Sequence, residues 1–425
     1  MSAVQRFVDP KRLRRDIEAN AEFGRLETDA GWGRTVLPGT DANRAARERL
    51  VDRLSDAGLD VRVDAVGNIV GRYVPPGVDP GIAAVAAGSH LDSVPSGGIF
   101  DGPLGVYGAL EAVRAIDESD HVPGRPISVV SFTEEEGHRF TDGLLGSSVV
   151  AGDLDPNAAL SFVDDDGVSL RSALSRIGFC GDDVIDARAW DSWLELHVEQ
   201  GERLLDAGAA AGIVDSIAGT IRCSVAIEGV ADHSGTTRMS GRTDALAAAS
   251  ELVLSTERVA AETGGRTVAT VGSLEVDPGA VNVIPGRVEL RIDVRDTDYD
   301  NMTAIVAAIT DELERLETER GVRTTVERSY DIRPTPMSDR CRSALYAGAE
   351  SAGLEPVSLH SGAGHDTMKI AEATDAGLCF VPSEDGASHS PDEWTTWDDC
   401  ADGVRMLAGG IVELATVDTS IGLRG

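Results

Sequence analysis

Lysine is the residue type that this sequence most lacks. Only Lys11 and Lys369 occur among the 38 basic residues, so the other 36 are arginines. A nucleotide-binding P-loop requires a lysine between glycine and serine or threonine, and neither lysine has those neighbours. A catalytic Schiff base would also have only these two side chains to use. The shortage of lysine therefore excludes a P-loop enzyme and leaves two candidates for lysine-based covalent catalysis.

Positive charge is also scarce. The chain has 72 acidic residues, and its formal net charge is −34. Nucleic acids and anionic membranes both bind through basic surfaces, so we expect neither as a partner. Acidic residues outnumber basic ones both inside and outside residues 216–330, so the charge is not an acidic tail. Such a surface suits a very salty cytoplasm, where ions screen self-repulsion. We interpret the protein as halophilic, with an unusually acidic mesophilic protein as the alternative.

Cysteines and long apolar runs are few or missing. The five cysteines lie far apart with no Cys-x-x-Cys spacing, so we expect no disulfide framework and no cysteine zinc site. No apolar run of about 18 residues could span a membrane. Residues 1–15 are charged and lack the apolar core of a signal peptide, which predicts a cytoplasmic protein. No Gly-x-Ser-x-Gly elbow suggests a serine hydrolase.

The two ends of the chain alternate between apolar strands and helices. This order is typical of an α/β domain with a mainly parallel sheet and flanking helices. The predicted strands are residues 81–92, 126–133, 193–198, 355–359 and 377–381, and the predicted helices are residues 104–116 and 397–414.

The middle of the chain follows a different order. Strands and helices there alternate as β-α-β-β-α-β, which predicts a split-βαβ, ferredoxin-like domain. Its predicted elements are residues 220–228, 243–262, 266–275, 287–295, 300–319 and 322–329. We therefore expect one α/β domain, built from residues 1–215 and 331–425, that is interrupted by a smaller domain at 216–330. Hinges are expected near residues 215–219 and 330–334.

Histidines and carboxylates collect where the predicted strands end. His90, His197 and His389 each follow or end an apolar strand, Asp101 lies in the turn after the first, and residues 134–136 are three glutamates. Open α/β sheets place ligand sites at the carboxyl ends of their strands. Imidazole and carboxylate together suit Zn²⁺, with Mn²⁺, Co²⁺ or Ni²⁺ as alternatives. Each histidine alone is better explained as an ordinary loop residue, but their joint position predicts a metal site.

Seven segments also resemble one protein family, in order and over residues 20–415. They are similar to the hydantoinase/carbamoylase amidohydrolases, which belong to the wider aminoacylase and carboxypeptidase metallopeptidase superfamily. That family includes N-carbamoyl-L-amino acid hydrolases, β-ureidopropionases and allantoate amidohydrolases. The matching segments are residues 88–93, 98–102, 134–140, 194–201, 232–237, 361–366 and 388–391. One departure is Arg238, where the family usually has proline.

The resemblance implies a catalytic site with two divalent metal ions. Asp101 would bridge both ions. Glu136 and His389 would complete the site of one ion, and His90 and His197 that of the other. Glu135 would be the general base, and Asp92 would orient His90 by accepting its second ring proton.

The resemblance also implies residues that bind the substrate. His233 and Asn282 resemble the donors to the developing oxyanion, and Arg295 resembles the arginine that clamps the substrate carboxylate. From the residues alone, Arg295 could instead form an ion pair on a strand surface, and Asn282 could be a turn residue. The remaining implied contacts are Gln200, Gly362, Gly364, His365 and Ser388.

The implied activity is hydrolysis of the carbamoyl (ureido) C–N bond of N-carbamoyl-L-amino acids or allantoate, with release of ammonia and CO₂. His197 stands where many peptidase relatives have a carboxylate, which favours this branch. An aminoacylase or dipeptidase, and a metal-binding protein without activity, are the alternatives. The resemblance further implies a homodimer in which the inserted domain closes over the site as a lid. In the family, His233 can come from the partner.

Overall fold

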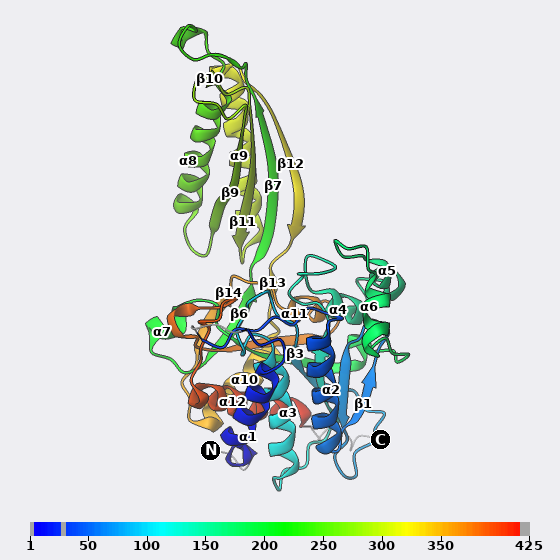
Figure 1. Cartoon of the computed structure of the whole chain (residues 1–425). Coiled ribbons are helices and arrows are strands. Elements are labelled where there is room, and N and C mark those ends of the chain that lie inside the picture. The colour runs from blue at the N-terminus through cyan, green and yellow to red at the C-terminus, as the bar shows by residue number, and fades with distance from the viewer. Residues whose placement is uncertain (1–3, 27–30, 417–425) are drawn as a thin grey trace, which may run out of the picture. The chain divides into compact units, whose positions relative to one another are not determined.

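The computed structural model describes residues 4–26 and 31–416. Contacts divide the chain into two compact units (Figure 1). The first unit joins Met1–Asp215 to Met337–Gly425, and the second is Ser216–Pro336.

The first unit contains a nine-stranded sheet whose central strands are parallel. The central order is β4 (Ile127–Phe132), β3 (Ala84–His90), β5 (Trp190–Val198) and β15 (Asp375–Val381). Antiparallel strands flank this centre on both sides. They are β1 (Asp60–Val63), β2 (Ile69–Tyr73), β6 (Gly212–Ile217) and β13 (Thr335–Pro336), while β14 (Val357–Ser361) pairs with β6. The predicted mainly parallel sheet is confirmed.

Helices cover both faces of this sheet (Figure 1). Alternate residues of β3 enter two separate apolar clusters, because strand side chains alternate between faces. Val85 lies in one cluster with residues of α3 (Pro103–Asp117) and α12 (Trp397–Ala415). Ala86 lies in the other cluster, with Val150 of α4 (Leu145–Ala151) and Ile370 of α11 (Asp366–Ile370). Strands buried on both faces explain the continuous apolar runs in the sequence.

The helices of this unit have the following bounds. They are α1 (Pro10–Ala21), α2 (Asp41–Asp56), α3 (Pro103–Asp117), α4 (Leu145–Ala151), α5 (Pro156–Ser161), α6 (Leu170–Ile177), α7 (Arg203–Ala207), α10 (Asp339–Ala352), α11 (Asp366–Ile370) and α12 (Trp397–Ala415). Helix α3 packs very close to the sheet, since a Cβ on Gly105 would lie 2.5 Å from the Leu196 carbonyl oxygen. This close packing brings the turn before α3 to the carboxyl ends of the strands.

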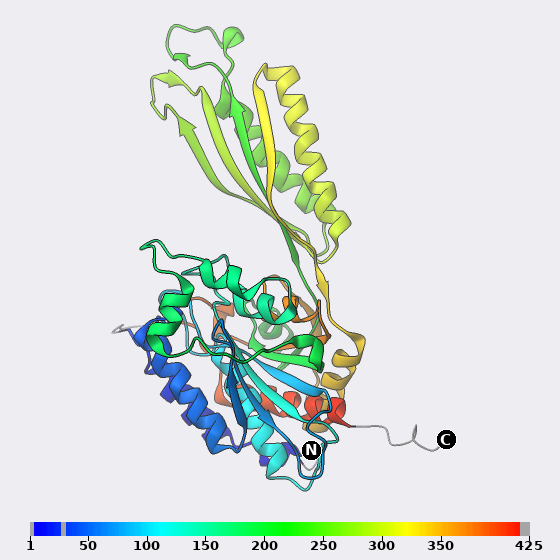
Figure 2. The ribbon, with the colours of Figure 1, turned by 90° about the vertical axis from the view of Figure 1, so that its right-hand side faces the viewer.

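The second unit is a four-stranded antiparallel sheet covered on one face by two helices (Figure 2). The strand order is β12-β7-β11-β9, and β8 pairs separately with β10. The elements are β7 (Gly219–Glu228), β8 (Asp232–His233), α8 (Ala245–Thr263), β9 (Val268–Asp277), β10 (Val283–Ile284), β11 (Arg287–Asp296), α9 (Tyr299–Arg320) and β12 (Arg323–Ile332). The predicted β-α-β-β-α-β order is confirmed.

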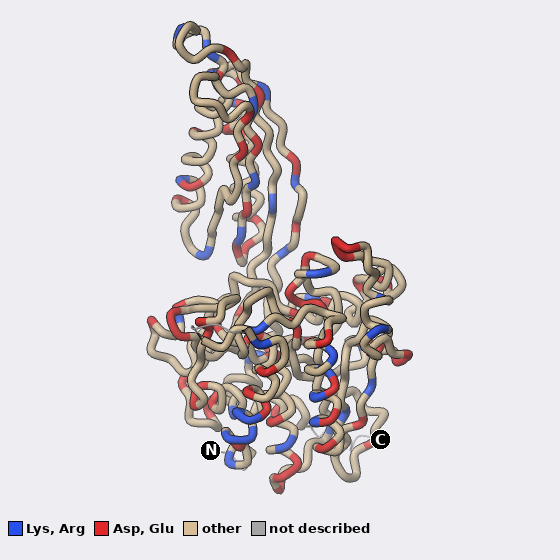
Figure 3. The backbone as a smooth tube through the Cα atoms, in the orientation of Figure 1, with Lys and Arg blue, Asp and Glu red and all other residues tan. Residues whose placement is uncertain are grey.

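The distribution of charged residues and the state of the cysteines agree with the expectations from the sequence. Figure 3 shows acidic residues along both units, mixed with arginines. All five cysteines are free, and four of them are buried. No helix in the described part of the chain is long and apolar enough to cross a membrane.

Candidate metal centre

Five places in the chain bring polar side chains to the carboxyl ends of the parallel strands. His90 is the last residue of β3, His197 is the penultimate residue of β5, and the three glutamates follow β4. Asp101 lies two residues before α3, and His389 lies in the loop between β15 and α12. The parallel arrangement makes these ends neighbours, as expected for an α/β sheet.

His90, Asp101 and His197 form a first, buried cluster whose ligand atoms lie within 4.8 Å of one another. The Asp101 Oδ1 atom is 3.5 Å from His90 Nε2 and 3.4 Å from His197 Nε2. The Nδ1 atoms of the two rings lie 3.1 and 3.0 Å from the carbonyl oxygens of Asp92 and Val198. A proton on Nδ1 satisfies each carbonyl and leaves Nε2 as the ligand atom.

Asp101, Glu136 and His389 form a second cluster by the same distance criterion. His389 Nε2 lies 3.3 Å from Glu136 Oε2 and 3.7 Å from Asp101 Oδ2. The His389 side chain is 49% exposed, so this cluster opens to solvent. The two oxygens of Asp101 therefore face different clusters, which is the arrangement of a bridging carboxylate.

Gln200 and Ser388 hold the second oxygen of Asp101. The Gln200 amide and the Ser388 hydroxyl donate to Asp101 Oδ2 at 2.9 and 2.7 Å. Gln200 Nε2 also lies 3.4 Å from His389 Nε2. Both residues were expected to contact substrate, and in this structure they contact two of the candidate metal ligands, Asp101 and His389.

Asp92 contacts His90 in a different way from the one expected. Its backbone carbonyl, not its carboxylate, faces the His90 ring. The Asp92 carboxylate instead accepts the N–H of Glu136 at 3.2 Å. The reason is local, because β3 ends at His90 and the extended backbone after it places the Asp92 carbonyl beside the ring. The Asp92 side chain thus positions Glu136.

Glu135 lies beside the first cluster. Its Oε2 atom is 3.7 Å from His90 Nε2, and its side chain is 11% exposed. Burial, reinforced by the nearby Asp366 carboxylate, raises the pKa of Glu135 well above its ordinary value. Glu134 has a φ of 58°, so the backbone changes direction there. The side chains of the next two glutamates can therefore approach different clusters. A buried carboxyl group of raised pKa suits general acid–base work.

Opposite charges set the protonation of the first cluster. Burial opposes ionisation of Asp101, but His197 and His90 hold the pKa of its carboxyl well below the usual range. Burial lowers the pKa of His197, but the facing Asp101 carboxylate has the opposite effect. On balance, the pKa of His197 is raised to about 10. His365 is different, because burial and the neighbouring His197 keep its pKa well below the ordinary value. The neutral His365 ring lies 4.8 Å from that of His197 and bonds to the Ser361 hydroxyl.

A pocket of about 370 Å³ adjoins this centre. Gln200 and Gly362, both predicted to bind substrate, line it, whereas Gly364 is only close by in the chain. Arg203 and His360 also line it, and sequence reasoning missed them as pocket residues. Arg203 donates to the His360 carbonyl oxygen at 3.1 Å. The pocket lining therefore carries one arginine together with two glutamates, Glu199 and Glu202.

Three residues of the second unit were predicted to bind substrate, and they lie near opposite ends of strand β11. His233 pairs with Val283 of β10, and the Ser234 N–H donates to the Asn282 carbonyl oxygen, so His233 and Asn282 lie together and exposed. Arg295 lies near the opposite end of β11 and donates to Asp293 at 2.8 Å. At about 3.3 Å per residue, β11 separates the two ends by roughly 26 Å.

Two buried charged residues at the centre were missed by sequence reasoning. The Glu393 carboxylate accepts the N–H groups of Phe100 and Asp101 at 2.9 and 3.1 Å. The Arg34 side chain is fully buried and donates from Nε to the Gly98 carbonyl oxygen at 3.0 Å. Glu393 had a usable signal, since it follows His389 in one short polar loop, but Arg34 had none.

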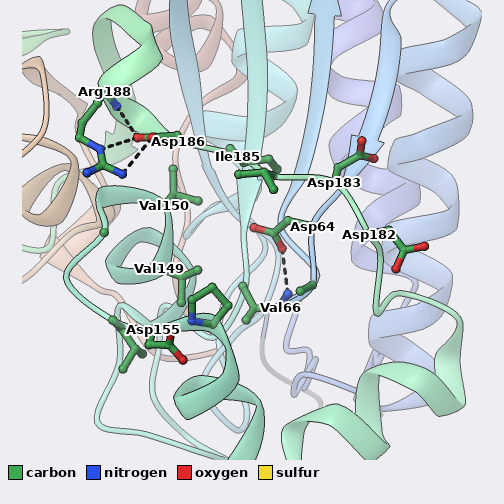
Figure 4. A pocket seen from close by; sticks show the side chains of 15 residues that line it. Asp64, Val66, Val149, Val150, Asp155, Asp182, Asp183, Ile185, Asp186 and Arg188 are labelled. Atoms are coloured by element: carbon green, nitrogen blue, oxygen red, sulfur yellow. Dashed lines mark hydrogen bonds and ion pairs between the residues drawn. The ribbon is translucent and has the colours of Figure 1, made fainter.

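A second pocket of about 470 Å³ lies elsewhere in the first unit (Figure 4). Its lining residues include the apolar Val149 and Val150 and several aspartates. Its arginine, Arg188, is paired with Asp186. None of the predicted site residues lines this pocket, so we do not connect it with the metal centre.

Known proteins resemble this chain along most of its length. The profile of the peptidase family M20/M25/M40 matches residues 86–413. N-carbamoyl-L-amino acid amidohydrolase of Geobacillus stearothermophilus is 41% identical over 398 residues, 93% of this chain and 96% of that protein. Allantoate amidohydrolase of Bacillus subtilis strain 168 is 35% identical over 340 residues, 78% of this chain and 81% of that protein. The crystal structure of an amidase of the hydantoinase/carbamoylase family from Burkholderia multivorans has a TM-score of 0.90 at 34% identity, covering 96% of this chain and 98% of that one.

Proposed function

Because this chain belongs to the peptidase family M20/M25/M40, and within it to the hydantoinase/carbamoylase amidases, we propose that it is a two-metal amidohydrolase that cleaves a carbamoyl (ureido) C–N bond. The chain is an enzyme, a hydrolase of C–N bonds. The proposed substrates are N-carbamoyl-L-amino acids or allantoate, as the names of its relatives suggest. Water and the ureido group would give a free amine, ammonia and CO₂.

The observation that carries this proposal is the position of Asp101 between two ligand clusters. Its Oδ1 faces His90 and His197, and its Oδ2 faces His389. Glu136 completes the second cluster. Nitrogen and oxygen donors in these numbers fit Zn²⁺ best, and Mn²⁺, Co²⁺ or Ni²⁺ also accept them. Two divalent cations bound there would supply Lewis acidity to the ureido carbonyl and lower the pKa of water.

Glu135 is the proposed general base. Its carboxylate lies beside His90 at the edge of the first cluster, where it can take a proton from the attacking water. Its raised pKa favours the protonated form once that proton has arrived. The protonated carboxyl group can then give the proton to the leaving nitrogen, so one residue serves as base and acid.

The substrate would be held by residues of both units. We propose that the pocket next to Gln200, with Gly362, Gly364, His365 and Ser388 nearby, receives the substrate body. Arg295 would bind the substrate carboxylate, for which its ion pair with Asp293 must open. His233 and Asn282 would donate to the oxyanion.

We also propose a homodimer, with residues 216–330 as the lid and dimerisation domain. The support is the roughly 26 Å along β11 between Arg295 and the end that carries His233 and Asn282. An N-carbamoyl amino acid is much shorter than this distance. If all three residues contact one substrate, they must come from two subunits, with His233 of the partner subunit completing the site.

A salty cytoplasm is the proposed environment for the acidic surface.

An ammonia assay tests the proposed function. The protein is purified in high salt and given allantoate and several N-carbamoyl-L-amino acids, with and without chelator. We expect ammonia release that the chelator abolishes and added Zn²⁺ or Mn²⁺ restores. Cleavage of N-acyl-amino acids or dipeptides without any ammonia from ureido substrates would sink the proposal in favour of an aminoacylase or dipeptidase. Activity that resists the chelator would remove the metal mechanism.

A further inference from the structure

We propose that Glu393, together with Arg34, is a positioning residue that holds the Asp101 turn in place for metal binding. The inference rests on the proposed metal centre and extends it to the residues that hold its ligands in place. Neither side chain belongs to the two ligand clusters. Both are buried, with exposed fractions of 1% for Glu393 and 0% for Arg34.

Glu393 joins the two loops that carry metal ligands. It lies four residues after His389, and its Oε1 accepts the N–H groups of Phe100 and of Asp101 itself. A Cβ added to Gly98 would lie 2.2 Å from this oxygen, so the turn fits closely around the carboxylate. The backbone of one ligand, Asp101, is thus fixed by a side chain from the loop of another.

Ser388 adds a second connection between these loops. Its hydroxyl lies 2.7 Å from Asp101 Oδ2 and 3.4 Å from Glu393 Oε2. One hydroxyl has one proton, so the shorter contact with Asp101 receives it. Glu393 therefore acts through the backbone of Asp101, while Ser388 acts on its carboxylate.

Arg34 supports the same turn from its other side. Its backbone N–H donates to the Gly97 carbonyl oxygen at 2.9 Å, and its Nε donates to that of Gly98. Its two terminal nitrogens have no hydrogen-bond partner within the described part of the chain. A buried guanidinium in this state needs opposite charge nearby. Burial lowers the pKa of Arg34, and the nearby Glu393 and Asp101 carboxylates counteract this effect.

These contacts predict an effect on metal binding that ordinary packing would not give. Without the Glu393 carboxylate, the N–H groups of Phe100 and Asp101 lose their acceptor, and the Asp101 carboxylate loses its fixed backbone. Residues that orient metal ligands typically change metal affinity by about 10- to 100-fold when mutated. For Arg34, the direction of the change in metal affinity distinguishes a positioning role from a purely electrostatic one. Removing a cation near two divalent ions should by itself tighten their binding, whereas loss of positioning should weaken it.

The test is a Co²⁺ titration of the whole protein in high salt, followed by visible absorption, which reports ligand geometry. We expect Glu393→Ala and Glu393→Asp to weaken Co²⁺ binding by at least about 10-fold and to change the spectrum. Glu393→Gln should keep the wild-type spectrum, because its amide oxygen still accepts both N–H groups, and should lose less affinity than Glu393→Ala, because only the charge is removed. Arg34→Met should weaken binding, and Arg34→Lys should restore part of it.

Asp64→Ala is the matched control. Asp64 is also buried and accepts two backbone N–H groups, those of Val66 and Asn68, but its turn carries no ligand (Figure 4). It should lower the melting temperature and leave the Co²⁺ spectrum unchanged. If either the spectrum and affinity survive Glu393→Ala and Glu393→Asp, or Asp64→Ala changes them equally, Glu393 has no positioning role. Tighter binding by Arg34→Met would overturn the role of Arg34.

The same titration separates this inference from the proposed function. A wild-type protein that binds no Co²⁺ would overturn the metal centre and the inference together. Wild-type protein that binds Co²⁺ but hydrolyses no ureido substrate would contradict the proposed function alone, and the variants would still test the positioning role by their spectra.

Discussion

Asp101 shows how much a single side chain can organise. Its two oxygens face the two ligand clusters, and its backbone N–H bonds to Glu393. Gln200 and Ser388 donate to the oxygen on the second side. At the residue scale the ligand types were predictable from the sequence, because histidine and carboxylate at strand ends indicate metal chemistry. The donors that fix the orientation of Asp101 were not predictable as such, since Gln200 and Ser388 were expected to contact substrate.

Glu135→Gln should separate metal binding from turnover. The amide cannot take a proton from water, so kcat should fall by about 10²- to 10⁴-fold. Metal content should stay at the wild-type value, because Glu135 is in neither cluster. Metal analysis of the purified protein and the ammonia assay measure the two quantities. The paired variant Glu136→Gln should lose metal, and a fully active Glu135→Gln would assign the base elsewhere.

Asp64 predicts a pH dependence of stability. Burial raises the pKa of Asp64 from 3.8 to about 6. A folded-state pKa above the unfolded value means that the folded protein holds the proton more tightly. The Asp64 contribution is therefore fully present below about pH 4 and is lost as the pH rises through 6. A shift of this size corresponds to roughly 3 kcal/mol.

The measurement is the difference in unfolding free energy between wild type and Asp64→Asn from pH 4 to 7. The variant should lack this part of the pH slope. Its absolute stability should also drop, since the new amide would face the Asn68 amide that now donates to Asp64. The slope, and not the level, is therefore the readout, and an unchanged slope would contradict the assigned pKa.

At the scale of elements, the centre depends on close packing around β3. Helix α3 starts two residues after Asp101 and lies against β3 and β5. The central strands were predictable because they are apolar on both faces. The edge hairpin β1–β2 was not predicted, since β1 has four residues and is only partly buried. Helices α1, α2 and α10 were also not predicted, although each packs on the larger core.

Gly88→Ala tests the packing of β3. A Cβ at this position would lie 1.9 Å from the Val130 carbonyl oxygen in β4, and backbone cannot move aside as a side chain can. We expect a loss of at least about 3 kcal/mol in unfolding free energy, as for severe overpacking. Denaturant unfolding followed by circular dichroism measures it.

Gly272→Ala provides the control for this prediction. Gly272 lies in β9 at a register shift, and a Cβ there would meet nothing within 4 Å. The control should change stability by less than about 1 kcal/mol. Equal losses from the two substitutions would show that the close approach of β3 and β4 does not limit stability.

At the scale of the whole molecule, charge and subunit organisation matter most. The net charge of −34 is spread over both units, while the candidate metal centre contains only a few of the carboxylates. A strongly acidic protein that binds an anionic substrate needs a local positive region. Two bound cations and Arg295 would provide it, and salt would screen the rest.

Salt should raise the thermal stability. Self-repulsion of the acidic surface is screened as the Debye length falls from about 30 Å at 0.01 M to about 3 Å at 1 M. The melting temperature should therefore rise most steeply below about 1 M KCl. Equal ionic strengths of NaCl and KCl should act alike. Unchanged fold and activity after dialysis into low salt would contradict the halophilic interpretation.

Mixing two inactive variants tests the shared site. The His233→Ala variant lacks the proposed oxyanion donor, and the Glu135→Gln variant lacks the proposed general base. If the catalytic His233 belongs to the partner, half of the mixed dimers' sites receive both intact residues. Co-refolded subunits should then regain about a quarter of wild-type activity. Each variant alone is the control, and a mixture without recovered activity would place His233 in its own subunit's site or outside it.

The sequence by itself determined the order of the central strands and of the inserted domain, and the chemical types at the strand ends. Both follow from local patterns, because apolar runs and turn residues act over a few neighbouring positions. Only the tertiary structure decided which atoms meet. Glu393 and Asp101 are 292 positions apart, and Arg34 and Gly98 are 64 apart, yet they share one turn. No local period encodes such contacts, since they arise when the close packing of α3 and the sheet brings distant loops to one edge.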